Sequence, residues 1–402
     1  MNQSGGLVAA VPLVAAAALV LGGGGFRPAS AEATFLHEGR GLLPAPADPT
    51  FLSKQYARCT ACHYSASGGG LLTPYGRSLS REEISTFGRQ EPGGGSPAAA
   101  TGEENFLFGA LSSESPLQLG LDIRPSHLEV HIPGRNIPDR NFIMNLDLQA
   151  AWRHDRWTAY GTIGREPTHG GARPISYEHW LAYQVSDGIS VRGGRFLPAY
   201  GVRVADHTSF MRESLDLAQD DQVYGVEVGV STDRSLLQLS VGPGRAESLV
   251  DDDGRQALTA AGRWQLDLGS RMVFAASARY RAESRAVPRS TDTGLSFGYA
   301  PAAWLTTWTH ADVRFQRLNA SSRSYILANR TSVQAFRGLW LRVSPQWRWT
   351  ETDPRGEARR TAFGLDFYPR THWHVNLSYY RDHLQFTGVS TQTLLAQLHL
   401  YL

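Results

Sequence analysis

The sequence from about residue 105 onward predicts an all-β fold of about sixteen antiparallel strands, on the strength of three observations. Segments of roughly ten residues alternate apolar and polar side chains, as in Phe142–Trp152 and Trp373–Tyr379, which is the period of a strand with one apolar face. The connections between these segments alternate in length. The last segment, Thr393–Leu402, ends on alternating apolar residues at the carboxyl terminus itself.

The connections favour a transmembrane antiparallel β-barrel over a soluble β-sandwich or propeller, which is the alternative. Short turns lie near 154–155, 187–188, 232–234, 269–270, 300–302, 337–338 and 370–371. Longer polar stretches cover 125–140, 166–173, 197–222, 242–256, 282–289, 317–322, 351–358 and 383–391. Both ends of the strand series fall on the short-turn side, as in bacterial outer-membrane barrels with their even strand number. Closure of the sheet also pairs the backbone N–H and C=O groups of the edge strands, which would have no hydrogen-bond partners in lipid.

The first 31 residues are typical of a secretory signal peptide. An apolar run over Leu7–Leu21 is followed by glycines and by the small residues Ala29, Ser30 and Ala31, a suitable cleavage site. The residues before the run contain no Lys or Arg, which departs from the usual pattern. A retained membrane anchor is the alternative, but the run is shorter than the ~18 to 20 residues that a spanning helix needs.

Composition narrows the remaining classes. A hydrophobic content of 42% and a net charge of +2 exclude a disordered chain and give no sign of a nucleic-acid binder. Arginine supplies all but one of the 39 basic residues, the exception being Lys54. Codon bias or an arginine-lined lumen would each account for this preference.

The only two cysteines form the segment Cys59-Thr60-Ala61-Cys62-His63. C-x-x-C-H is the attachment signature of a c-type haem, in which two thiols bond the porphyrin edge and the adjacent imidazole ligates the iron. A zinc site would need a second pair of Cys or His residues at finger spacing, and a chance match is the remaining alternative. We therefore predict one haem c, with Cys59 and Cys62 as covalent sites and His63 as an axial ligand.

The second axial ligand is left open by the sequence. Methionine is missing from the segment around the motif, so the candidates are His37 after the cleavage site, His207 or Met211 if the haem unit enters the barrel, or no protein ligand. Gly68–Gly70 would let the backbone approach the porphyrin face, or form a turn.

A small haem-binding unit is predicted over 32–90 and a Pro/Gly/Ala-rich linker over 91–104, before the barrel over 105–402. Ala47-Asp48-Pro49-Thr50-Phe51 precedes the haem motif, and Leu72-Thr73-Pro74-Tyr75-Gly76-Arg77 follows it. With these segments the chain resembles the fused monohaem cytochrome-porins of bacterial outer membranes, which include outer-membrane iron oxidases. The resemblance implies an A-x-P-x-F segment before C-x-x-C-H and an L-x-x-F/Y-G-R-like segment after it. The glycine triplet and the segment Leu72-Thr73-Pro74-Tyr75 depart from the iron-oxidase pattern, which leaves open a sister clade with another electron donor or acceptor.

The third long connection, 197–222, has the position at which porins fold a loop into the pore. It follows Gly194-Arg195-Phe196 and contains Pro198-Ala199-Tyr200-Gly201, which resembles the start of that loop in phosphate-selective and related porins. The lumen candidates are therefore Arg195, Arg203, Asp206 and His207. A solvated external loop is the alternative.

The two parts together suggest an electron conduit in the outer membrane. A haem inside a pore would pass single electrons between an extracellular donor or acceptor, with Fe(II) as one candidate, and a periplasmic carrier. An extracellular iron oxidase is the enzyme that this would define. The alternatives are a diffusion porin whose haem domain senses redox state or gates the pore, and a haem enzyme or gas-binding protein.

Overall fold

The structure is a computed structural model, and every residue that it describes belongs to one compact unit, Gly41–Leu402. The described residues are 49–55, 58, 62–65, 68–87, 115–165, 174–202, 206, 208–215, 217, 222–244, 257–283, 288–317, 321–351, 357–384 and 388–402. No helix among them is long and apolar enough to cross a bilayer. The predicted signal peptide lies outside these residues.

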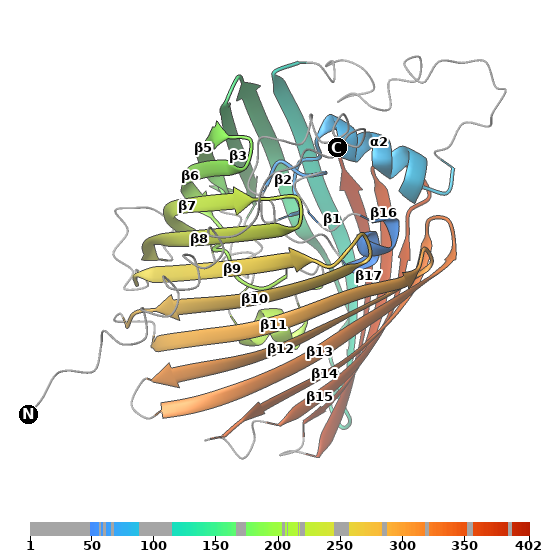
Figure 1. Cartoon of the computed structure of the whole chain (residues 1–402). Coiled ribbons are helices and arrows are strands. Elements are labelled where there is room, and N and C mark those ends of the chain that lie inside the picture. Colours follow the sequence, from blue (N-terminus) through green and yellow to red (C-terminus); the bar gives the residue numbers. More distant parts are fainter. Residues whose placement is uncertain are drawn as a thin grey trace, which may run out of the picture. The chain divides into compact units, whose positions relative to one another are not determined.

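A single antiparallel sheet closes on itself to form the barrel (Figure 1). Among the described residues, sixteen strands make up its wall, and a two-residue segment, β4 (Pro174–Ile175), extends the pairing of β3. The wall strands are β1 (Leu117–His131), β2 (Arg140–His154), β3 (Trp157–Arg165), β5 (His179–Ser186), β6 (Ile189–Phe196), β7 (Val223–Ser231), β8 (Ser235–Gly244), β9 (Thr259–Asp267), β10 (Met272–Arg281), β11 (Arg289–Ala302), β12 (Leu305–Arg317), β13 (Ser321–Phe336), β14 (Leu339–Thr350), β15 (Ala358–Phe367), β16 (Trp373–Leu384) and β17 (Val389–Tyr401).

Closure is made by β17, which pairs with both β16 and β1. Asp122 on β1 lies opposite Tyr401, and His131 lies opposite Gln392, so the pairing spans the length of the last strand. No sheet edge is then left between the first and last wall strands, which is the condition for a sheet in lipid. The predicted closed barrel of about sixteen strands is confirmed, and a sandwich or propeller is excluded.

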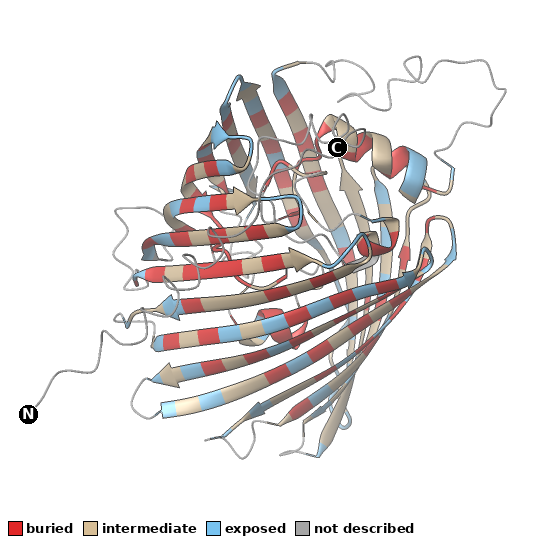
Figure 2. Cartoon of the chain, in the orientation of Figure 1, coloured by how far each residue is buried: buried red, intermediate tan, exposed pale blue. Residues whose placement is uncertain are grey.

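The alternation of side chains is the reverse of that in a water-soluble sheet (Figure 2). On β14, Leu341 and Val343 are exposed, whereas Arg342 and Ser344 between them are buried. The same pattern on the other strands puts leucine, valine and phenylalanine outside and arginine, aspartate, glutamine and serine inside. An apolar exterior around a polar interior is what a lipid-embedded barrel requires.

Two segments fill part of the barrel interior. The N-terminal segment contains the 3₁₀ helix η1 (Pro49–Lys54), the α-helix α2 (Pro74–Leu79) and the π-helical turn η3 (Ser80–Ile84). The connection from β6 to β7 contains the short helix α3 (Phe210–Ser214). Leu52 of η1 packs in one cluster with Val202 of that connection and with Trp308 on the wall.

Several strands extend into the predicted connections, and β1 extends farthest. Strand β1 continues to His131, into the predicted loop over 125–140, because a register shift at Arg124 and Pro125 keeps the strand paired past the proline. The predicted turn at 300–302 lies within β11, which ends at Ala302.

Candidate functional site

The N-terminal segment is fixed to the inner side of the barrel wall at several points. Arg58 forms an ion pair with Asp267 at the end of β9, with 2.8 Å between Nη2 and Oδ2. The Ser65 hydroxyl donates to Glu178 Oε2 at 2.8 Å, and this contact is buried. Tyr64 and Leu71 pack on Tyr160 and Trp180, whose rings stack at 5.2 Å. The segment is thus held by wall residues from several strands.

A tight hairpin carries the second half of the C-x-x-C-H motif. The Thr73 amide donates to the Cys62 carbonyl at 2.8 Å, and the Tyr64 amide donates to the Leu71 carbonyl at 3.0 Å. Between these bonds, Gly68–Gly70 have φ angles of 77°, 71° and 66°. Three successive left-handed residues strongly favour glycine. The described backbone therefore uses the triplet as the turn of this hairpin.

The helix α2 begins directly after the hairpin and covers Cys62. Thr73 caps it by accepting from the Gly76 amide, and Pro74 occupies the first turn, where a missing N–H costs nothing. A side chain at Gly76 would lie 2.9 Å from the Cys62 Cα, so only glycine lets the helix approach this closely. The L-x-x-Y-G-R segment therefore places α2 against Cys62 of the C-x-x-C-H motif.

His63 lies on the same hairpin, and its Nδ1 faces the Gly70 carbonyl at 3.4 Å. A proton on Nδ1 would let the ring donate to this carbonyl, which is the arrangement of a metal-ligating histidine whose other nitrogen bonds the backbone. Burial raises the pKa of the Cys62 thiol to about 12.

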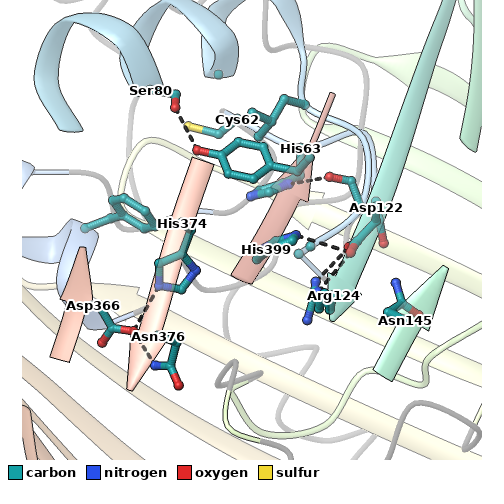
Figure 3. Close-up of a pocket in the computed structure, with 18 of the residues that line it drawn as sticks. Cys62, His63, Ser80, Asp122, Arg124, Asn145, Asp366, His374, Asn376 and His399 are labelled. Carbon is teal, nitrogen blue, oxygen red and sulfur yellow. Dashed lines mark hydrogen bonds and ion pairs between the residues drawn. The ribbon is translucent and has the colours of Figure 1, made fainter. Parts of the chain in front are cut away.

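Cys62 and His63 line a cavity of about 280 Å³ between the N-terminal segment and the barrel wall (Figure 3). The wall contributes charged and polar groups from β1, β2, β14 to β17 and the β6–β7 connection. They include Asp122, Arg124, Arg342, Asp366, His374 and His399.

Two carboxylates in this lining are held by arginine. Asp122 accepts from Nε and Nη2 of Arg124 at 2.9 and 2.7 Å. Asp366 accepts from Nη1 of Arg342 at 2.9 Å. These arginines belong to an arginine-lined interior, one of the two explanations for the preference for arginine over lysine. Their hydrogen bonds fix the carboxylates in place.

The donor set fits the attachment of a c-type haem, because the Cys62 thiol and the His63 imidazole line the same cavity. Cys59 and His37 lie outside the described residues.

The lumen candidates fall in different places. The described parts of the connection 197–222 contact the inner wall, which favours the inward loop over the solvated external one. The Tyr200 hydroxyl donates to Asp312 Oδ1 at 2.9 Å, and the Phe210 amide donates to Gln346 Oε1 at 2.7 Å. Asp206 lines the cavity and accepts from the Thr208 amide and hydroxyl.

Arg195 lies on β6, is buried, and donates from Nη1 to the Ser176 carbonyl just before β5. Its side chain therefore contacts the neighbouring part of the wall. Arg203 and His207 lie outside the described residues. Met211, a candidate iron ligand, is buried in an apolar cluster with Phe210 and Leu215. That packing gives its side chain a structural role.

Sequence reasoning missed His374 and His399. Alternation alone places both on the polar face of their strands, but the strand register that brings them opposite each other involves non-local pairs. The sequence does carry one signal for this pair. The last two strands each place a histidine on their polar, inward face.

Comparisons with known proteins support the fold. No family model and no curated protein matches this chain. OmpT of Vibrio cholerae, in its in-vitro folded trimer form, superposes with a TM-score of 0.55 at 8% identity, covering 71% of this chain and 99% of that one. OprB of Pseudomonas putida gives 0.53 at 8% identity, with 71% and 94% covered. An anion-selective porin from Comamonas acidovorans gives 0.50 at 10% identity, with 71% and 99% covered. The fold is that of an outer-membrane porin barrel.

Proposed function

We propose that this chain is an outer-membrane electron conduit of the fused cytochrome-porin type. The observation that carries the proposal is the position of Cys62 and His63 on a cavity inside a lipid-type barrel, next to α2, Arg124 and Arg342. The haem c would be held by thioether bonds to Cys59 and Cys62 and ligated by His63. When bound, it supplies one-electron transfer.

The barrel would separate this site from lipid and open it to redox partners on both sides of the membrane. The apolar exterior keeps the barrel in the outer membrane, and the short turns are expected on the periplasmic side. The N-terminal segment lies at that end, within reach of a periplasmic carrier. Asp206 belongs to the connection on the opposite, external side and reaches the same cavity. An extracellular donor or acceptor would then exchange electrons without crossing the lipid, and the resemblance to outer-membrane iron oxidases makes Fe(II) one candidate.

The test uses full-length protein from a host that attaches c-type haem. Mass spectrometry should find one added porphyrin, absent in Cys59→Ser/Cys62→Ser. In vesicles, the wild-type protein should reduce a membrane-impermeant acceptor inside when a reductant is added outside, at a rate at least tenfold above that of the double variant. Protein without the porphyrin mass, or equal rates for both proteins, would reject the conduit.

A diffusion porin with a redox-sensing or gating haem domain is the second candidate. The names of the structural neighbours favour it, since one is described as an anion-selective porin and shares the barrel fold. It predicts solute flux through vesicles that contain the protein, changing with the redox state of the haem. Electron transfer with solute flux no higher than that of empty vesicles would instead support the conduit.

A further inference from the structure

Two histidines face the cavity from the last two strands of the barrel. His374 on β16 and His399 on β17 are direct cross-strand partners, and their ring centroids lie 5.9 Å apart. Both line the cavity that Cys62 and His63 line, and Figure 3 shows them beside those residues. The wall therefore presents imidazoles to the same space as the C-x-x-C-H motif.

Each of these imidazoles lies close to a carboxylate. His399 Nε2 lies 3.2 Å from Asp122 Oδ1, and His374 Nε2 lies 3.0 Å from Asp366 Oδ1. The two contacts differ, because His374 Nε2 is hydrogen-bonded to Asp366, whereas His399 Nε2 is buried and makes no hydrogen bond to the described residues. A neutral His399 with its proton on Nδ1 would offer the Nε2 lone pair to a metal in this cavity.

The contacts of the C-terminal strand distinguish the two histidines. Tyr401, two residues after His399, shares a hydrogen bond of 2.9 Å with Ser80, directly after α2. The Leu402 amide donates to the Leu121 carbonyl, and Leu71 of the hairpin packs over the neighbouring Gly120. The segment that carries His63 is thus fixed against the end of the strand that carries His399.

His374 is held differently. Its ring stacks on Tyr368 in a parallel arrangement, with the centroids 4.4 Å apart and 8° between the ring planes. One face of this ring is therefore covered by an aromatic side chain of the β15–β16 turn.

We propose that His399 is the second axial ligand of the iron, through its buried Nε2. The inference rests on the proposed function, because it needs the haem at Cys62 and His63. It makes the closing strand of the barrel part of the cofactor site, so that ligation links the N-terminal segment to the wall.

The test is spectroscopic and uses full-length, haem-loaded protein. Wild type should show a six-coordinate, low-spin spectrum and bind no carbon monoxide when reduced. His399→Ala should become high-spin and bind carbon monoxide stoichiometrically, and added imidazole should restore the low-spin spectrum. His374→Gln is the matched control, a cavity-lining and carboxylate-paired histidine on the neighbouring strand, and should keep the wild-type spectrum.

A second variant covers poor folding of the alanine protein. His399→Met retains a long side chain that can ligate iron through sulfur, and should give a thioether–iron absorption band with a raised reduction potential. A wild-type spectrum in haem-loaded His399→Ala or His399→Met would overturn the assignment, as would loss of the low-spin spectrum in His374→Gln. Absence of covalent haem from wild type would instead reject the proposed function.

Discussion

At the scale of single residues, the glycine triplet determines the geometry around His63. We expect Gly70→Ala to loosen the hairpin, because φ is 66° there and a Cβ would lie 2.5 Å from the Tyr160 hydroxyl. The left-handed conformation alone costs an alanine about 1 kcal/mol. Hydrogen exchange of the Tyr64 amide, which donates to Leu71, should accelerate at least tenfold.

The matched control for this change is Gly134→Ala. Gly134 has a φ of 76°, and nothing lies within 4 Å of its Cβ position, so the substitution has the conformational cost without the steric one. Equal acceleration at the amides nearest each site would contradict a steric role for Tyr160.

Cys62 is expected to be a poor nucleophile in haem-free protein. Burial raises its pKa from 9.0 to about 12, so folding disfavours the thiolate. The unfolded chain loses this proton at lower pH than the folded one, and the stability contributed by the protonated thiol therefore falls as pH rises from about 9 to 12. In Cys59→Ser, alkylation of Cys62 at pH 9 should be at least a hundredfold slower in folded than in urea-unfolded protein. Similar rates would show that the thiol is accessible, and attachment of haem would then not have to precede burial.

At the scale of elements, local pattern and pairing contribute differently to prediction. The order of short turns and long connections predicts nearly all strand ends. Turn residues interrupt the alternation of apolar and polar side chains, and this alternation depends only on residues that are close in the sequence. The length of β1 was missed, since Pro125 normally marks a strand end and is accommodated here by a register shift. The grouping of His399 with Asp122 and His63 could not be predicted, since it depends on three segments far apart in the chain.

The inward connection between β6 and β7 is anchored by a buried hydrogen bond. Tyr200→Phe removes only the hydroxyl that donates to Asp312, which is itself buried. A buried acceptor without its donor costs about 1–3 kcal/mol, so the connection should detach more often from the wall. Hydrogen exchange at the Phe210 amide should rise by at least fivefold, while the barrel strands keep their protection. Tyr325→Phe, at an exposed tyrosine that donates to Glu351, is the control and should leave the Phe210 amide unchanged.

At the scale of the whole molecule, the wall and the interior have separate tasks. The exterior provides a closed apolar surface to lipid, and inward arginine, aspartate and glutamine residues hold the N-terminal segment and the β6–β7 connection. Together these segments narrow the passage that a porin of this size would leave open. The molecule therefore combines a porin wall with an interior organised around a cavity between the N-terminal segment, the β6–β7 connection and the wall.

This arrangement predicts that the N-terminal segment limits ion flow. The double variant Arg58→Ala/Ser65→Ala removes two contacts of the N-terminal segment, the Arg58 ion pair with Asp267 and the Ser65 hydrogen bond to Glu178. The Ser65 bond is buried and has a charged acceptor, and such a hydrogen bond contributes about 1.5–3 kcal/mol to stability. In planar bilayers, wild type should show a small unitary conductance, and the double variant should show frequent openings to a larger level. Deletion of residues 49–87 should hold the larger level permanently, and circular dichroism should confirm that its strands remain. Arg323→Ala, on an exposed side chain of β13, should conduct like wild type. A deletion variant with wild-type conductance would show that the β6–β7 connection alone sets the narrowest point of the lumen.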